Sequence, residues 1–421
     1  MLSEFEFNLH RQISGLKALN NVNELAKIGY RFVGTKGDRE SIEYMEGQFK
    51  SYGLDVKELP IRVPTYEEEK PLLRILATGE ELECVTPLFS PSTPTGGLEA
   101  GLVLVGDGTE EDYGRVNAKG KIVVLTETAL GFDKFWVGPF AQRAARAGAV
   151  GLILIHPAPW PYRMSMEAGN SNPKQRFCEQ KLPAVCVSAI GGYKLMHAIG
   201  KQESLVRLET KTLIERRESI IISAFHHGIE YPEERVGILA HRDSAITAGA
   251  NDNGSGSGTM LEIARVLSQS KPKRSFEFIS TTAEDGATIG AYTYCEAHKA
   301  DLVKNMKALI DIDMLSGAGV VKQIEVGHWP DTEPIKHPAW LMNIVDDVAT
   351  DLGYGFGRMS ASWGVPEEAR FIDIGVPATC FWGDEDPYYH SIHDVASKVN
   401  PSNLKAAADT VAIVVWRLAN K

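Results

Sequence analysis

The residues of this chain that could do chemistry begin in one short stretch, where an apolar strand pattern leads into a glycine-rich turn. His241 and Asp243 stand two positions apart in the strand pattern, so their side chains point to the same face. A neutral imidazole beside a carboxylate is a common metal ligand with its orienting partner. Asp252 follows in the turn, from which a carboxylate can reach back and bridge two metal ions. The alternative is an ordinary helix start, with Asn253 or Ser255 as its cap.

Further groups of polar residues each follow a short apolar run typical of a strand. The runs 276–281, 307–313 and 377–382 end in, or lead to, side chains that can bind metals: Glu284, Asp285, Asp313 and His390. In open α/β sheets, ligands bind outside the carboxyl ends of the strands. Because all these residues stand at or after strand ends, we expect them to meet His241 and Asp252 at one edge of a sheet.

Two histidines and three carboxylates suit a pair of divalent ions. One shared carboxylate would give each ion three protein ligands and leave a position for water. Imidazole and carboxylate ligands favour Zn²⁺, with Mn²⁺ or Co²⁺ as alternatives. Such ions, about 3.5–4 Å apart, can hold a hydroxide between them and lower its pKa toward neutrality. One carboxylate must stay off the metals to take the proton, and Glu284, beside Asp285, is the natural residue for this.

The elements that must position these residues form an α/β pattern. From about residue 220 onward, strand-like runs alternate with helical patterns. This alternation predicts a mostly parallel central sheet covered by helices on both faces. The span 62–216 differs, with frequent prolines and glycines followed by short strands around an alanine-rich helix. We therefore predict a discontinuous domain, residues 1–61 and 217–421, interrupted by a smaller α/β domain over 62–216.

Composition narrows the range of partners. The 421 residues carry a formal net charge of −11, which disfavours nucleic acid and anionic membranes, since both need a basic face. No apolar run reaches the roughly 18 residues of a membrane span, and the N-terminus lacks the basic and apolar regions of a signal peptide. Five scattered cysteines in no metal-type spacing suit reduced thiols in a cytoplasm. A secreted protein whose leader has been removed would look the same.

Taken together, the motifs resemble those of the co-catalytic zinc aminopeptidases, a family that includes aminopeptidase Y, the bacterial leucyl aminopeptidases and glutamate carboxypeptidase. The resemblance rests on five motifs in the family's order: His241-x-Asp243, Gly249-Ala-Asn-Asp252-Asn-x-Ser-Gly, Ala-Glu284-Asp285-Gly, Asp313-Met and Tyr389-His390-Ser-x-x-Asp394. It implies a zinc-exopeptidase-like fold for the discontinuous domain. The inserted span resembles the protease-associated domain that many members carry.

The resemblance implies two metal-binding sets that share one residue. His241 and Asp313 would hold one zinc ion, Asp285 and His390 would hold the other, and Asp252 would bridge them. Asp285 stands where the family usually has glutamate. Because aspartate is one methylene shorter, the second metal could sit differently, bind more weakly or be another ion.

The resemblance also implies roles for residues beside the metals. Glu284 would act as general base and then general acid, and Asp243 would orient His241. Tyr389 matches a tyrosine that polarises the scissile carbonyl in some members, and a packing aromatic beside the site is the alternative. Asp394 is expected to support the ligands or to cap a helix rather than to bind metal.

Two segments are open to more than one interpretation. Residues 366–371 replace the Ser-Asp-His-x-x-Phe motif that usually precedes the last strand in the family. We interpret Glu368 and Arg370 in this segment as a surface pair, with substrate contact as the alternative. The segment Arg31–Gly37 is interpreted as a solvated turn, with a pocket wall as the alternative.

The sequence thus predicts a two-metal exopeptidase, and an aminopeptidase acting on the N-terminal bond of peptides is our first hypothesis. A carboxypeptidase or dipeptidase would need a cationic clamp, for which Arg370 is a candidate. A glutaminyl-cyclase-like transferase would generally use one zinc and lack the insert. A metal-free binding protein on the same fold is the remaining alternative. The preferred substrate residue, the native metal and the oligomeric state, a homodimer included, stay open.

Overall fold

The computed structural model describes the chain in several ranges: residues 1–126, 135–168, 172, 175, 177, 180–202, 204–285, 288–316, 321–327, 332–361, 366–383 and 386–421. It divides into two compact units, a larger one made of Met1–Pro64 and Arg216–Lys421, and an inserted unit, Thr65–Glu215. These boundaries differ by no more than three residues from the predicted 62–216. The chain passes between the units within two long strands, β1 (Asp55–Glu68) and β10 (Thr212–His226).

The larger unit is built on a mixed sheet whose central strands are parallel. The strands follow in the order β1, β10, β12 (Arg274–Thr281), β11 (Tyr231–His241), β13 (Met306–Asp313), β17 (Ala378–Gly383), β14 (Val321–Gly327) and β15 (Ile335–Lys336), with β16 (Gly357–Ala361) beside β14. Strands β12, β11, β13 and β17 are parallel neighbours, whereas β10 and β14 flank them in antiparallel pairing. The predicted α/β fold with a largely parallel centre is therefore confirmed.

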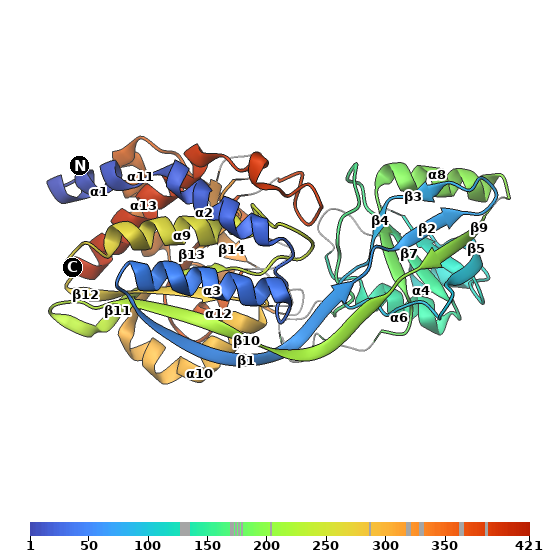
Figure 1. Cartoon of the computed structure of the whole chain (residues 1–421), viewed down its shortest axis with the longest axis horizontal. Coiled ribbons are helices and arrows are strands. Elements are labelled where there is room, and N and C mark those ends of the chain that lie inside the picture. Colours follow the sequence, from blue (N-terminus) through green and yellow to red (C-terminus); the bar gives the residue numbers. More distant parts are fainter. Residues whose placement is uncertain are drawn as a thin grey trace. The chain divides into compact units, whose positions relative to one another are not determined.

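Helices cover both faces of this sheet (Figure 1). On one face lie α1 (Glu4–Gln12), α2 (Gly15–Ile28), α3 (Lys36–Ser51), α9 (Gly254–Leu267), α11 (Ala339–Leu352) and α13 (Pro401–Asn420). The other face carries α10 (Ile289–Asn305) and α12 (Glu368–Asp373). Because side chains alternate along a strand, Ile238 and Ile310 enter the core under α9, while Leu239 and Asp311 point to the side of α10 and α12.

Small residues let α2 and α9 approach closely. A Cβ atom at Gly258 would lie 2.8 Å from Cγ2 of Val22, so only glycine fits there. Helices α10, α11 and α13 belong to the predicted alternation of strand and helix patterns after residue 220. Helix α1 was not predicted, although Ser3 and Glu6 form a capping box at its start, which is a recognisable signal.

The inserted unit has its own sheet and its own core. Its strands follow in the order β3 (Glu81–Leu82), β2 (Leu72–Ile75), β9 (Leu205–Glu209), β5 (Leu98–Leu104), β6 (Ile122–Leu125), β7 (Gly151–Ile155), β8 (Ala184–Val187) and β4 (Cys84–Val85). Strands β5 to β8 are parallel, and the unit also contains α4 (Glu110–Gly114), α6 (Gly138–Arg146) and α8 (Ala189–Gly200). A separate apolar cluster fills it, including Val124, Ile153 and Val185.

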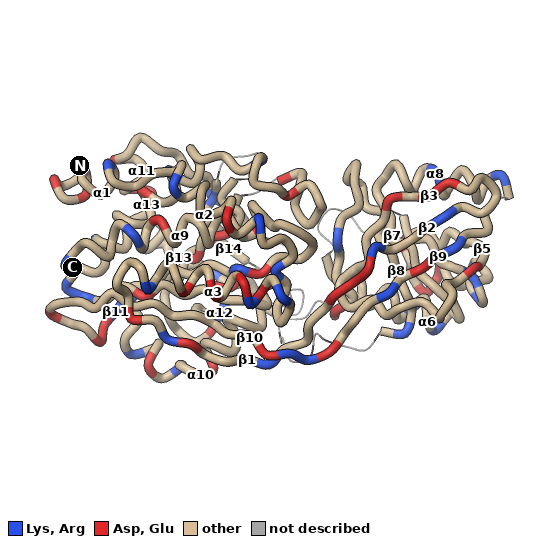
Figure 2. The backbone as a smooth tube through the Cα atoms, in the orientation of Figure 1, with Lys and Arg blue, Asp and Glu red and all other residues tan. Residues whose placement is uncertain are grey.

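Charged residues of both signs are interspersed along both units (Figure 2). None of the described helices is long and apolar enough to cross a membrane.

Candidate metal centre

The candidate ligands lie where the central strands end. Strand β11 ends at His241 and strand β13 ends at Asp313. The segment after β12 carries Asp285, the segment after β17 carries His390, and Asp252 stands just before α9. Parallel strands in register bring their carboxyl ends to one edge of the sheet, which is where α/β proteins bind ligands. The structure therefore brings all five predicted ligands together.

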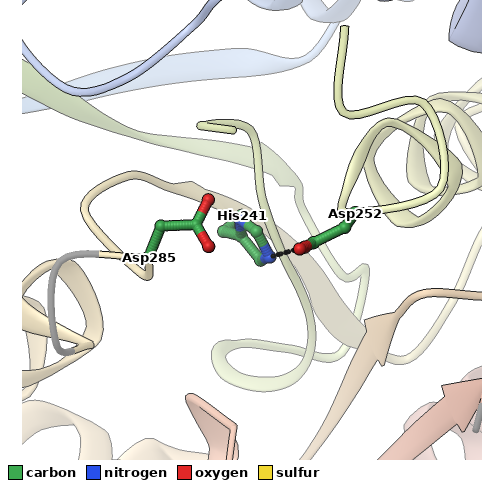
Figure 3. A group of neighbouring side chains, drawn as sticks. All are labelled: His241, Asp252 and Asp285. Atoms are coloured by element: carbon green, nitrogen blue, oxygen red, sulfur yellow. Dashed lines mark ion pairs between the residues drawn. The ribbon is translucent and has the colours of Figure 1, made fainter. Parts of the chain in front are cut away.

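Asp252 lies between the two imidazoles. Its Oδ1 is 3.3 Å from Nε2 of His241, and its Oδ2 is 3.0 Å from Nε2 of His390. Asp313 Oδ1 is 3.5 Å from His241 Nε2, and Asp285 Oδ1 is 3.0 Å from His390 Nε2. In Figure 3 the carboxylates of Asp252 and Asp285 both point toward the His241 ring. The arrangement is two sets of three ligand-type side chains with Asp252 in common.

Several atoms of this cluster lack the hydrogen bonds that buried polar atoms normally make. Both ring nitrogens of His241, Oδ2 of Asp285 and Oδ1 of Asp313 are buried without a hydrogen-bond partner in the described structure. Asp243 Oδ1 lies 3.3 Å from His241 Nδ1, the position that an orienting carboxylate occupies. Imidazole nitrogens and carboxylate oxygens that converge without partners fit divalent metal ions well.

The electrostatics of the cluster tie the imidazoles to the carboxylates. Burial alone would lower the pKa of His390, but hydrogen bonds to Asp252 and Asp285 outweigh it and raise that pKa to about 10. Burial would likewise lower the pKa of His241. The negative charges of Asp313 and neighbouring carboxylates outweigh burial and hold this pKa well above its ordinary value. In the metal-free cluster the carboxylates therefore favour the protonated form of both imidazoles. A divalent ion bound by the same atoms would displace these protons.

Glu284 differs from the five candidate ligands because the residue as a whole is half-buried, whereas they are buried. Burial of its carboxyl group, together with the charges of Asp285 and Asp313, raises its pKa well above the ordinary value, while His241 opposes the shift. Its backbone N–H donates to Oδ1 of Asp243 at 3.3 Å. A carboxyl group with a raised pKa, on a half-buried residue beside the candidate ligands, suits a residue that takes and returns a proton.

The glycine- and serine-rich motif ties the strand ends together. Asn253, one of the two cap candidates in the sequence, is the N-cap of α9, and its side-chain oxygen accepts the backbone N–H of Gly256 at 2.8 Å. Its amide nitrogen donates to the carbonyl of Ile312 in β13 at 3.0 Å. The Ser257 hydroxyl donates to the carbonyl of His241 at 2.8 Å. A Cβ at Gly256 would lie 2.1 Å from the Ile312 carbonyl oxygen, so the motif needs glycine there.

Asp394 holds the backbone around Asp252 in place. Its carboxylate accepts the backbone N–H groups of Asn251 at 2.7 Å and Asp252 at 3.1 Å. The Asn251 side chain in turn donates to Asp386 at 2.7 Å. These bonds connect the segment that carries His390 with the segment that carries Asp252. The side chain thus contacts the backbone beside a ligand, which is the supporting position expected for it.

Three non-glycine residues beside the candidate ligands have a left-handed backbone. Ala283, which precedes Glu284, has φ 60°; Met314, which follows Asp313, has φ 50°; and His390 itself has φ 50°. Such conformations cost about 1–3 kcal/mol each and cluster at functional sites, where the surrounding contacts impose them. Here they turn the chain directly at the residues that build the cluster.

Tyr389 packs against the site. Its ring centroid lies 3.8 Å from that of His390 at an interplanar angle of 32°, and its side chain also packs against the apolar cluster that includes Met314 and Trp382. This contact accounts for the aromatic residue at this position. Its predicted role in polarising a substrate carbonyl stays a prediction.

Arg31 shows that the interpretation of its segment as a solvated turn was wrong. Its guanidinium is fully buried and donates to the carbonyls of Arg242 at 2.8 Å and Gly249 at 3.0 Å, and also to that of Ala248. It therefore clamps the loop that leads to Asp252 onto the end of β11. The available signal was an arginine next to two apolar residues just before a helix, which is unusual for a solvated turn.

The interpretation of Glu368 and Arg370 as a surface pair was also wrong. Both side chains are buried, because the short helix α12 packs against β13 and β17. Glu368 Oε1 lies 2.7 Å from Nε2 of His337, and Arg370 Nε donates to the Thr288 hydroxyl at 3.0 Å. The six-residue helix is too short to leave a clear periodic pattern in the sequence, so its burial could not be predicted.

The sheet, its helices and the position of the imidazole–carboxylate cluster at its carboxyl edge correspond to the zinc-exopeptidase-like α/β fold. Comparison with known proteins agrees with this fold. Residues 222–415 match the family model described as Peptidase family M28. Over these residues the chain is similar to Peptidase family M28.

Relatives resemble the chain over nearly its whole length. Aminopeptidase YwaD of Bacillus subtilis (strain 168) is 24% identical over 412 residues, which cover 96% of this chain and 85% of the relative. Carboxypeptidase Q of Mus musculus is 25% identical over 408 residues, covering 93% and 83%. The solved structure of BSAP, a zinc aminopeptidase from Bacillus subtilis, has a TM-score of 0.77 at 22% identity and covers 97% of this chain and 96% of that one. At this identity the structural likeness shows the fold.

Proposed function

We propose that the chain is a two-metal aminopeptidase. The observation that carries the proposal is the position of Asp252, whose two carboxylate oxygens each face one imidazole, His241 and His390. A carboxylate with one oxygen toward each of two separate ligand sets is what two neighbouring metal ions require. Zinc is the proposed metal, because the ligands suit it and because the similar BSAP is named a zinc aminopeptidase.

His241, Asp313 and Asp252 would hold one ion, and His390, Asp285 and Asp252 would hold the other. When bound, the ions supply Lewis acidity for the substrate carbonyl and make water more acidic. Burial of the five side chains keeps bulk water away from their ligand atoms and strengthens every charge interaction among them.

Glu284 would do the proton chemistry. Its carboxylate takes a proton from the attacking water and passes it to the nitrogen of the leaving amine, so that each turnover returns it to its starting state. Asp243, 3.3 Å from Nδ1 of His241, would hold that imidazole with Nε2 toward the cluster. Tyr389 would donate a hydrogen bond to the oxygen that develops charge on the scissile carbonyl.

The proposal favours an aminopeptidase over a carboxypeptidase, although relatives of both names are similar to the chain. A carboxypeptidase binds a free carboxylate, and a basic side chain is the usual partner for it. Arg370, the candidate clamp, is buried. Its Nε donates to the Thr288 hydroxyl, and its Nη1 lies 3.7 Å from Oδ2 of Asp373. The carboxylate-rich centre instead suits a substrate with a free, positively charged amine.

We also propose that the inserted unit is a protease-associated domain. Two observations support this proposal. The unit is inserted between two parts of the larger unit, and it has an apolar core of its own.

Replacement of Glu284 by glutamine tests the mechanism. The side chain keeps its shape and leaves all five proposed ligands in place, so the variant should retain two metal ions per chain. Its kcat on aminoacyl-p-nitroanilides should fall by about 10²–10⁴-fold, because a positioned proton acceptor contributes that much. Glu296→Gln, an exposed position on α10, is the matched control and should keep full activity.

Full activity of Glu284→Gln with its metals bound would refute the mechanism. Faster hydrolysis of N-blocked dipeptides than of aminoacyl-p-nitroanilides by the native chain would refute the aminopeptidase assignment.

A further inference from the structure

A second buried group of ligand-type side chains lies on the sheet face covered by α12, apart from the candidate metal centre. Asp311 in β13 and Cys380 in β17 are directly paired across the two strands, and Glu368 is the first residue of α12. One potential ligand atom of each residue lies within 4.8 Å of those of the other two. All three side chains are buried. This group shares no residue with the candidate centre.

His337 adds a second and independent observation. Its Nε2 lies 2.7 Å from Oε1 of Glu368, and both side chains are fully shielded from solvent. In the described part of the chain, Oε2 of Glu368 and Nδ1 of His337 are buried without a hydrogen-bond partner. A carboxylate oxygen left without a partner in the protein interior is destabilising, so a missing partner is indicated.

The charges of the group point to a cation. Two carboxylates buried side by side repel each other and lose their hydration. The backbone N–H of Glu368 donates to Oδ2 of Asp311 at 3.2 Å, and His337 faces the other carboxylate. The nearest arginine in sequence, Arg370, is engaged with Thr288. Buried charges of this kind are normally paired or coordinate a metal.

We propose that Asp311, Glu368 and Cys380 bind a third divalent cation of the zinc class, with a structural role. A thiolate among hard carboxylates suits zinc, whereas calcium and magnesium avoid sulfur. Tetrahedral zinc at about 2.0–2.3 Å needs ligand atoms roughly 3.3–3.8 Å apart, and the potential ligand atoms of this group all lie within 4.8 Å of one another. His337 orients Glu368 through its hydrogen bond, as outer partners of metal ligands do.

The cation would tie α12 to strands β13 and β17. Asp313 follows Asp311 by two residues and points to the same face, so this tie would also steady one of the proposed catalytic ligands. The inference does not depend on the proposed function, because its ligands and its spectroscopic signature are separate from those of the catalytic centre.

Cobalt titration of the full-length, metal-free chain tests the proposal. The candidate catalytic centre offers nitrogen and oxygen ligands alone, so Co²⁺ bound there gives no thiolate-to-cobalt charge-transfer absorption. Co²⁺ bound to Cys380 gives this absorption in the near ultraviolet. We expect the absorption together with three equivalents of bound cobalt.

Substitutions then assign the signal. Cys380→Ser should abolish the absorption and remove one equivalent of cobalt, and Glu368→Gln should weaken binding of the same equivalent. Cys295→Ser, at another buried free thiol of the larger unit, is the matched control and should keep the full signal. Circular dichroism, with retention of the other two equivalents, shows that each variant is folded.

Absence of the charge-transfer absorption at saturating cobalt would overturn the proposal, as would its persistence in Cys380→Ser. Failure of the proposed function looks different: it leaves the charge-transfer signal intact while the two other equivalents are missing, or while Glu284→Gln stays active.

Discussion

Replacing Arg31 by lysine should weaken both the fold of the larger unit and its metal centre. The guanidinium uses a rigid fork to donate to the carbonyls of Arg242 at 2.8 Å and Gly249 at 3.0 Å. A lysine ammonium keeps the charge but concentrates its donors on one atom, so it cannot satisfy both sides of the fork. Loss of two hydrogen bonds made by a charged donor costs about 3–6 kcal/mol. The Gly249 carbonyl also accepts the backbone N–H of Gly254 at 2.9 Å, so it keeps a partner in the variant. The expected loss of stability therefore lies near the lower end of this range.

The assay is urea unfolding of the metal-free chain, followed by circular dichroism, together with calorimetric titration of Zn²⁺. Arg31→Lys should lower the unfolding midpoint at an unchanged m-value and should weaken zinc binding, because the loop it clamps leads to Asp252. Arg235→Lys is the matched control, since Arg235 is also buried and lies near the start of the same strand, paired with Glu277. The control should lose stability and keep its zinc affinity. An unchanged midpoint for Arg31→Lys, or equal zinc affinities for the two variants, would refute the reasoning.

Two further predictions concern the cluster itself. Asp252→Asn should lower the metal affinity of both sites by more than the ~10–100-fold that is typical when a hydrogen-bond partner of a metal ligand is lost. Elemental analysis should show that both ions are reduced. Loss of one ion alone would contradict a bridging role. Without metal, His390 has its pKa raised to about 10, above the roughly 6.5 of the unfolded chain, so its protonated form stabilises the fold. This stabilisation is complete below about pH 6.5 and is lost as the pH rises through about 10, so unfolding in chelator should become easier over that range. Greater stability at pH 10 than at pH 7 would contradict it.

Much of the site could be predicted because its chemistry follows strand ends. His241 and Asp313 end their strands, and Asp285 and His390 follow strands closely, so the general rule for α/β sheets placed them at one edge. Asn253 could be recognised as a helix cap because capping depends on the residues of the next turn alone. These features are local in the sequence or follow from topology.

The surroundings of the site could not be predicted in the same way. Arg31 is separated from the carbonyl of Gly249 by more than two hundred positions, and nothing near it in the sequence indicates that contact. Glu368 meets Asp311 and His337 only because α12 folds back over the sheet. Each of these partners comes from a different element of the fold. The residues next to Arg31 and Glu368 in the sequence fit a charged side chain in solvent equally well.

The sequence by itself determined the α/β class, the positions of the central strands and the identity of five ligand-type residues. It also pointed to one carboxyl group, Glu284, as the proposed proton carrier, because periodicity and strand-end chemistry are written in short segments. Tertiary structure alone decided which oxygen of Asp252 faces which imidazole, that Arg31 clamps the loop before it, and that Asp311, Glu368 and Cys380 form a second buried group. The physical reason is that distances of a few ångströms between remote segments depend on how whole helices pack against the sheet.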